Sequence, residues 1–149
     1  MSRRYSVVHE TAAGTTVTIL QVNAAATTTR GWIYDIIIGS DATPADVATQ
    51  FDVQRGTVSG TGTAVTPRAL DPGNPAAIFA GEGGTFTGQT KTASSAMLSF
   101  GLNQRATFRW VAVPDGEIVI PATSDNWVGV ESVASTGTPN TNCTISWQE

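Results

Sequence analysis

Apolar and polar residues alternate along much of the chain with a period of two, the spacing of side chains on a β-strand. The clearest example is Arg105–Ala112, where Ala106, Phe108, Trp110 and Ala112 share one face of an extended chain. A helix would scatter these four residues around its circumference. The stretch therefore predicts a strand whose apolar face, with Trp110, packs on a core.

Turn signals follow this strand. Pro114-Asp115-Gly116 predicts a turn, because proline presets φ and glycine tolerates a positive φ. Residues 117–120 then read as a short return strand, and Pro121 ends it because proline cannot donate to a strand ladder. Residues 127–133 resume as another strand, so this part of the chain predicts antiparallel pairing.

The same reasoning predicts further strands at residues 5–9, 15–22, 31–38, 50–55, 63–66, 96–102 and 142–147. Residues 15–22 carry apolar side chains on both faces, which is expected where one face meets the core and the other meets a loop or another subunit. One short helix is predicted near residues 44–49, with Thr43 as its N-cap and Pro44 at its first position.

Roughly eight to ten short strands separated by turns are typical of a β-sandwich or a barrel. We expect an all-β protein, with residues 1–149 forming a single-domain antiparallel β-sandwich of jelly-roll type. An immunoglobulin-like sandwich is the second choice. Residues 1–5 are expected to form an extended N-terminal arm, and residues 56–95, which are rich in glycine, proline and threonine, a long loop-rich insertion.

Composition narrows the classes of function. Only 13% of the residues are charged, the formal net charge is −4, and no basic cluster exceeds Arg3-Arg4, which argues against direct binding of nucleic acid. No apolar run approaches the roughly 20 residues of a membrane-spanning helix, and no secretory signal follows the N-terminus. We therefore expect neither a membrane nor a nucleic acid as partner, and synthesis in the cytosol.

Candidate chemistry is sparse. Cys143 is the only cysteine and His9 the only histidine, which excludes an intrachain disulfide and any multi-histidine metal site. Cys143 is expected to be a buried sheet residue. The carboxylates lie mostly in expected turns or on outward faces, where they usually bond local backbone. The sequence therefore predicts a protein that is not an enzyme, with no catalytic, metal-binding or cofactor-binding residues and no cofactor.

Three segments together resemble a known family. They are Tyr34–Arg55 (YDIIIGSDATPADVATQFDVQR), Val65–Ala76 (VTPRALDPGNPA) and Leu102–Ala122 (LNQRATFRWVAVPDGEIVIPA). Their order and spacing are similar to small capsid decoration (cement) proteins of tailed bacteriophages and cyanophages. The resemblance implies a jelly-roll fold, a homotrimer, and binding to the major capsid protein on the outer surface of the virion head after assembly in the host cytoplasm. The implied function is mechanical: the protein bridges neighbouring capsomers and stabilises the shell.

Terminal arms and irregular loops are free to adapt to a partner, whereas strands are committed to the sandwich. Seven residues are accordingly expected to contact partners: Arg3, Arg4 and Tyr5 in the arm, and Arg68, Leu70, Phe79 and Phe86 in the middle segment. The alternative for Leu70, Phe79 and Phe86 is that they plug the ends of the sandwich. Two other functions stay open. One is a carbohydrate- or receptor-binding module of a virion, such as a head fibre or tail, and the other is a small β-fold hydrolase with convergent carboxylates.

Overall fold

The computed structural model describes residues 2–25, 29–94 and 96–149, and these residues form strands and loops without a helix. The strands are β1 (Arg4–Ala12), β2 (Val17–Ala24), β3 (Gly31–Ala42), β4 (Ala48–Val58), β5 (Thr61–Val65), β6 (Arg68–Ala69), β7 (Phe79–Thr87), β8 (Thr90–Lys91), β9 (Leu98–Asn103), β10 (Thr107–Val111), β11 (Ile118–Ile120), β12 (Trp127–Ser135) and β13 (Asn140–Gln148). No helix in this part of the chain is long and apolar enough to cross a membrane.

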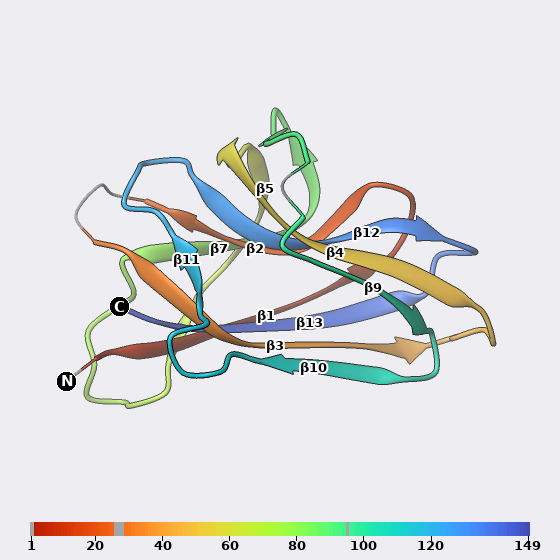
Figure 1. The fold of residues 1–149 in the computed structure, drawn as a ribbon, viewed down its shortest axis with the longest axis horizontal. Helices are drawn as coiled ribbons and strands as arrows, with labels where there is room; N and C mark the ends of the chain where they lie inside the picture. Colours follow the sequence, from red (N-terminus) through yellow and green to blue (C-terminus); the bar gives the residue numbers. More distant parts are fainter. Residues whose placement is uncertain (1, 26–28, 95) are drawn as a thin grey trace.

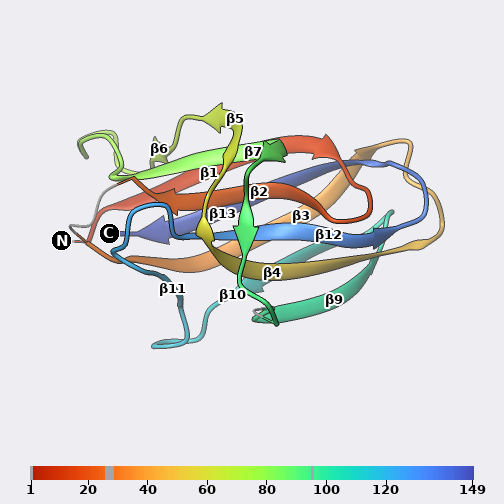
Figure 2. The ribbon, with the colours of Figure 1, turned by 90° about the horizontal axis from the view of Figure 1, so that it is seen from above.

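The strands form two antiparallel sheets that pack face to face (Figure 1). Sheet A has the order β10-β3-β13-β1-β6, with β11 also paired to β3, and sheet B has the order β5-β7-β2-β12-β4-β8, with β9 also paired to β4. The expected all-β sandwich is confirmed. Figure 2 shows the same two layers from above, with both chain termini at one end.

The pairing of strands has the nested order of a jelly roll. The first four strands of the chain pair with later strands in reverse order: β1 with β13, β2 with β12, β3 with β10, and β4 with β9. A long antiparallel ribbon folded over itself produces this order. Successive strand pairs thereby alternate between the two sheets.

One hydrophobic core lies between the sheets. Sheet A contributes Tyr5, Ile36 and Ile145, and sheet B contributes Leu20 and Val130, all of them buried. Trp147 stacks on Tyr5 with ring centroids 5.8 Å apart. Cys143 is buried in the same core as expected, and burial raises the pKa of its thiol.

The expected helix near residues 44–49 is wrong. Residues 43–47 form a loop, and β4 begins at Ala48. Thr43 has a left-handed φ of 50°, and the buried side chain of Gln104 accepts a hydrogen bond from Ala45 N at 2.9 Å. Gln104 N also donates to Val47 O at 3.0 Å. These bonds satisfy backbone groups that would otherwise pair within a single helical turn. Such a short helix is also unfavourable by itself, because its first turn fixes several residues for one hydrogen bond.

Residues 56–95 contain more regular structure than the sequence predicted. Phe79–Thr87 forms the nine-residue strand β7, although it contains glycines 81, 83 and 84 and lies within the predicted loop-rich insertion. Two of these glycines face the other sheet: a Cβ atom on Gly81 would lie 2.6 Å from Val7 Cγ2, and Gly83 lies against the ring of His9. The glycines therefore permit close approach of the two sheets rather than a turn.

The N-terminal arm is also shorter than predicted. Residues Arg4 and Tyr5 belong to β1, and Arg3 exchanges backbone hydrogen bonds with Glu149 at 3.2 and 2.9 Å. The sequence predicts a strand at residues 5–9, and pairing with the C-terminal strand extends it to Arg4. The two termini are thus held together at one end of sheet A (Figure 1).

The turn after β10 lies where the sequence placed it, with one change. Gly116 N donates to Val113 O at 2.8 Å, and the positive φ of 63° falls on Asp115 instead of Gly116. A Cβ on Gly116 would lie 2.7 Å from Val113 Cγ2. A side chain at position 116 would therefore make the exposed Val113 side chain shift, while aspartate tolerates the left-handed conformation.

Candidate docking surface

The structure separates the seven expected contact residues into three groups. Tyr5 and Phe79 are wrong as contact residues, because both side chains are buried in the core. Phe79 packs against the Gly31 backbone, as the alternative of a core plug expected. Phe86 is half-buried beside Gly62 on the sheet B side, remote from the other candidates.

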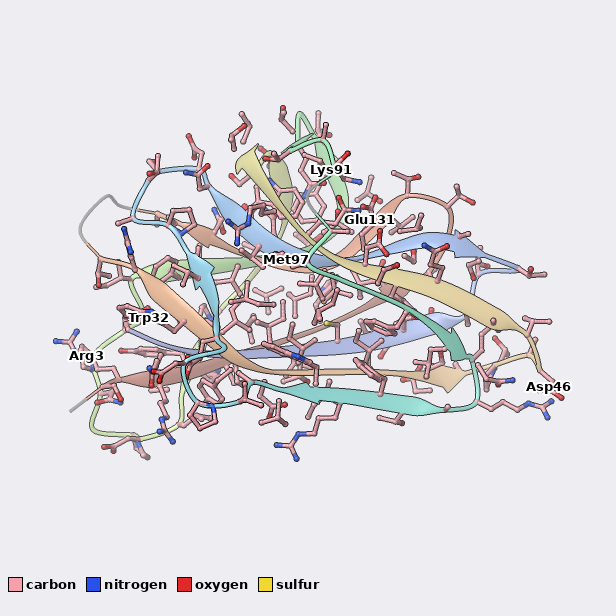
Figure 3. All side chains as sticks on the ribbon, viewed as in Figure 1. Arg3, Trp32, Asp46, Lys91, Met97 and Glu131 are labelled. Carbon is pink, nitrogen blue, oxygen red and sulfur yellow. The ribbon has the colours of Figure 1, made fainter. Side chains whose placement is uncertain are left out.

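The remaining four residues lie together at the end of sheet A that holds the termini. β6 pairs with β1 so that Arg68 lies opposite Ser6, and Leu70 N donates to Arg4 O at 2.9 Å. Arg3 immediately precedes β1 and points away from the sandwich in Figure 3. Arg4 and Arg68 are strand residues, so the prediction that loops rather than strands carry these positions is wrong for both.

Strand register puts Arg4, Arg68, Leu70, Trp32 and Tyr34 on or beside the outer face of sheet A, and we call this set the sheet A patch. Arg4 lies opposite Gln148, which lies opposite Trp32 on β3. Residues directly opposite one another on neighbouring strands share a face. Tyr34 occupies a bulge between the residues paired with Ser146 and Trp147, and the Arg4 guanidinium lies 5.5 Å from its ring centroid.

The sheet A patch is open and carries unpaired cations. Leu70 is 56% exposed, and Arg4 and Arg68 are exposed as well. Neither arginine forms an ion pair with a carboxylate of the described residues. A cation over a tyrosine face is stabilised by roughly 0.5–1 kcal/mol at an exposed site, which restricts the side chain without neutralising it. The patch is therefore an electropositive surface with apolar and aromatic neighbours.

Two features border this patch. On one side lies a hollow of about 420 Å³ between β1 and residues 64–68, lined by Val8, which is 55% exposed, and by Ser6 and Arg68. On the other side, Arg109 binds the nearly buried Asp35 through two hydrogen bonds of 3.0 and 2.7 Å. These bonds, together with the charge of Asp35, raise the pKa of Arg109. Since Arg109 is neutralised, it adds little charge to the surface.

The opposite outer face, that of sheet B, is covered by the chain itself. Gln21 donates to Ser59 O at 3.0 Å and accepts from Gln89 at 2.7 Å, while Trp127 Nε1 donates to Val58 O at 2.9 Å. These contacts bury the outward side of β2 and β12 beneath the segments around β5 and β8. Residues 15–22 are thus apolar on both faces because one face meets the core and the other meets loops of the same chain.

This covered face contains a carboxylate pair that the sequence did not reveal. Asp52 and Glu131 lie directly opposite one another on β4 and β12. Glu131 is only 2% exposed, forms an ion pair with Lys91, and accepts a hydrogen bond of 2.6 Å from Gln54. Figure 3 shows Lys91 and Glu131 pointing toward one another. Only the pairing register brings these four residues together, so no local sequence signal would have found them.

Two further titratable residues have shifted pKa values. The pKa of His9 is lowered by burial, and the pKa of Glu82 is raised by burial despite its hydrogen bond from Gln21. Within residues 2–25, 29–94 and 96–149, no three His, Cys, Asp or Glu side chains lie close enough to hold a metal ion. A second hollow, of about 290 Å³, lies beside Phe86 and Lys91 at the edge of the covered face.

The four tryptophans lie in the core or on the outer faces of the two sheets. Trp147 is fully buried in the core, and Trp127 is fully buried on the outer face of sheet B, beneath the segments that cover it. Trp110 faces the core as its phase predicts, but it lies in the edge strand β10 and is only partly buried. Trp32 is partly exposed within the sheet A patch. Neither a family model nor a curated protein matches this chain.

Proposed function

We propose that this protein is a non-enzymatic structural component of a virion, a decoration protein that binds the outer surface of a phage head and stabilises its shell. The sequence resemblance suggested this role, and the jelly-roll order of the strands agrees with the fold that the resemblance implies. The observation that carries the proposal is the sheet A patch, which brings Arg4, Arg68 and Leu70 from separate segments onto one open surface.

The physical properties of the molecule suit a mechanical role. An attached protein resists deformation of a shell when its own fold is rigid and its contact surface has a fixed shape. Here the outer face of sheet A is built from strands whose backbone is hydrogen-bonded along most of its length. A preformed surface of this kind loses little conformational entropy on binding.

Attachment to heads tests this proposal. Purified protein is mixed with phage heads that lack it, and the bound protein is measured after sedimentation. We expect saturable binding with a fixed number of copies per head, and heads that withstand a higher temperature before they release DNA. Heads that sediment without bound protein at micromolar concentrations would contradict the proposal.

The proposed assembly is a homotrimer that contacts the major capsid protein. The apolar pattern of residues 15–22 no longer supports a subunit contact, because the chain's own loops cover β2. The partly exposed apolar side chains of Leu98, Phe100 and Phe108 at the β9–β10 edge are an alternative site for such a contact. Light scattering coupled to size exclusion tests the trimer directly, and a monomer of 15.5 kDa at high micromolar concentration would exclude it.

A further inference from the structure

We propose that the sheet A patch recognises an acidic protein surface, with Arg4 and Arg68 binding carboxylates and Trp32 and Leu70 supplying apolar contact. This inference rests on the proposed function, in which the sheet A patch is the face that attaches to the head. The outer face of a sheet, rather than a flexible arm or loop, would then be the part of the molecule that meets the partner.

The positive charge of the patch favours an acidic partner. Arg4 and Arg68 lie on neighbouring strands, two residues apart in register, because Arg68 is opposite Ser6. Neither is neutralised by a carboxylate of the described chain, in contrast to Arg109, which binds Asp35, and Lys91, which binds Glu131. Two acidic residues adjacent in sequence or pairing to the patch are held by backbone amides: Asp71 accepts from Gly73 N, and Glu149 accepts from Ile78 N and Phe79 N. The two guanidinium groups thus retain their capacity to bind carboxylates in a partner.

The Arg4 side chain is preorganised for binding. Arginine presents its donors in a planar fork that matches a carboxylate. The Tyr34 ring beneath the Arg4 guanidinium holds that side chain over the sheet. Burial is the main cause that raises the pKa of Tyr34, and its hydroxyl stays neutral, so the ring adds no competing negative charge. A positioned guanidinium loses less rotamer entropy when it binds.

The shape of the patch border suits an apolar side chain of a partner. The hollow beside Val8 and Arg68 gives the patch a concave border that accommodates an apolar side chain next to the carboxylates. Interfaces combine an apolar centre with charged residues at the rim, and aromatic residues and arginine are enriched in them. Trp32, Leu70 and Val8 supply the apolar part of that composition, and all three are partly or largely exposed.

The same chemistry argues against a polyanion such as nucleic acid. Binding to a phosphate backbone draws on many cations. This patch has two arginines without a carboxylate partner among the described residues, with Arg3 beside them, in a molecule of net charge −4. A few carboxylates set in an apolar surface match that small number of charges better. The proposed partner is therefore an acidic region of a protein.

The test uses a glutamate-rich peptide as the probe and the full chain as the receptor. In ¹H–¹⁵N spectra, we expect the peptide to shift the backbone signals of Arg4 and Arg68 and the indole signal of Trp32. The double variant Arg4→Gln/Arg68→Gln should lose these shifts, and Arg105→Gln should keep them. Arg105 is the matched control because it is an exposed arginine at the opposite end of the molecule, next to β10. Shifts that are absent, that centre on Arg105, or that are stronger with a single-stranded oligonucleotide would overturn the inference.

A second measurement uses heads that lack the protein and separates this inference from the proposed function. If the wild type binds heads, Arg4→Gln/Arg68→Gln should bind at least tenfold more weakly and show a shallower dependence on salt, while Arg105→Gln binds like the wild type. Equal binding by the wild type and the double variant would overturn the inference and leave the proposed function standing. If the wild type fails to bind heads, the proposed function fails, and the peptide measurement decides the inference by itself.

Discussion

Gly81 in β7 faces Val7 in β1 across the interior of the sandwich, and a Cβ atom on Gly81 would lie 2.6 Å from Val7 Cγ2. The same close approach of the two sheets recurs at Gly83, which lies against the ring of His9. A segment that the sequence predicts to be loop-rich is therefore a strand of sheet B, between β5 and β2. Gly81 and Gly83 are sites of packing, whereas Gly84 has a positive φ of 85°.

Gly81→Ala should consequently destabilise the fold. Adding a methyl group to a filled interior costs typically 1–3 kcal/mol. Gly101→Ala in β9 is the matched control, because a Cβ there would meet nothing within 4 Å. We expect the control to be neutral or slightly stabilising, since alanine restricts the unfolded chain. Urea denaturation of both variants compares the free energies of unfolding, and equal values would refute this explanation of β7.

The tryptophans should differ in their contribution to stability. Trp147 is fully buried against Tyr5, whereas Trp110 lies in an edge strand and is partly exposed. Trp147→Ala should therefore cost about 3–5 kcal/mol. Trp110→Ala should cost less than about 3 kcal/mol, since less apolar surface is lost. Thermal and urea unfolding measure both, and a larger loss for Trp110 would contradict the burial seen here.

The ion pair on the covered face of sheet B should show strong coupling. Lys91→Met removes the cation from Glu131, which is only 2% exposed, and should destabilise the protein by roughly 1–3 kcal/mol. The double variant Lys91→Met/Glu131→Leu removes both charges and should recover much of that loss. A double-mutant cycle measured by urea unfolding gives the coupling free energy, and additive effects of the two substitutions would show that the pair is not coupled.

His9 gives the stability a dependence on pH. Burial lowers its pKa below the ordinary value of 6.5, so the unfolded chain binds a proton more readily than the folded chain. The contribution of His9 is therefore full above pH 6.5 and is lost as the pH falls through the folded-state pKa. Glu82 acts in the opposite direction, because burial raises its pKa. We therefore compare His9→Gln with the wild type: the variant should lose less stability between pH 7.5 and 5.5, and parallel curves would contradict this role of His9.

Much of the architecture follows from the sequence, because side-chain alternation and turn residues act locally. The strand at 107–111 and the turn at Pro114–Gly116 lie where these signals place them. The helix at 44–49 was wrong because local capping signals do not reveal the bonds that distant Gln104 makes to this loop. Strand β7 was missed because glycine has the same local signature in a turn and at a close contact between sheets.

The candidate site was predictable only in part, for the same reason. The sequence predicts Arg3, Arg4, Arg68 and Leu70 as contact residues, and this stays a prediction. Their convergence depends on the pairing of β6 with β1, which lies more than sixty residues away in the chain. Tyr5 and Phe79 were wrong because each falls on the inward face of its strand. Trp32 and Tyr34 were missed because only the register of β3 against β13 places them beside Arg4.

We propose that this protein attaches to a phage head through the outer face of sheet A. An electron cryomicroscopy reconstruction of heads that lack the protein, incubated with the purified chain, tests it most directly. We predict extra density on the outer surface of the shell that fits the sandwich, with the β3, β13 and β1 face toward the shell and Arg4 and Arg68 in the contact. Bare heads at saturating protein, or density in which that face points to solvent, would contradict the account.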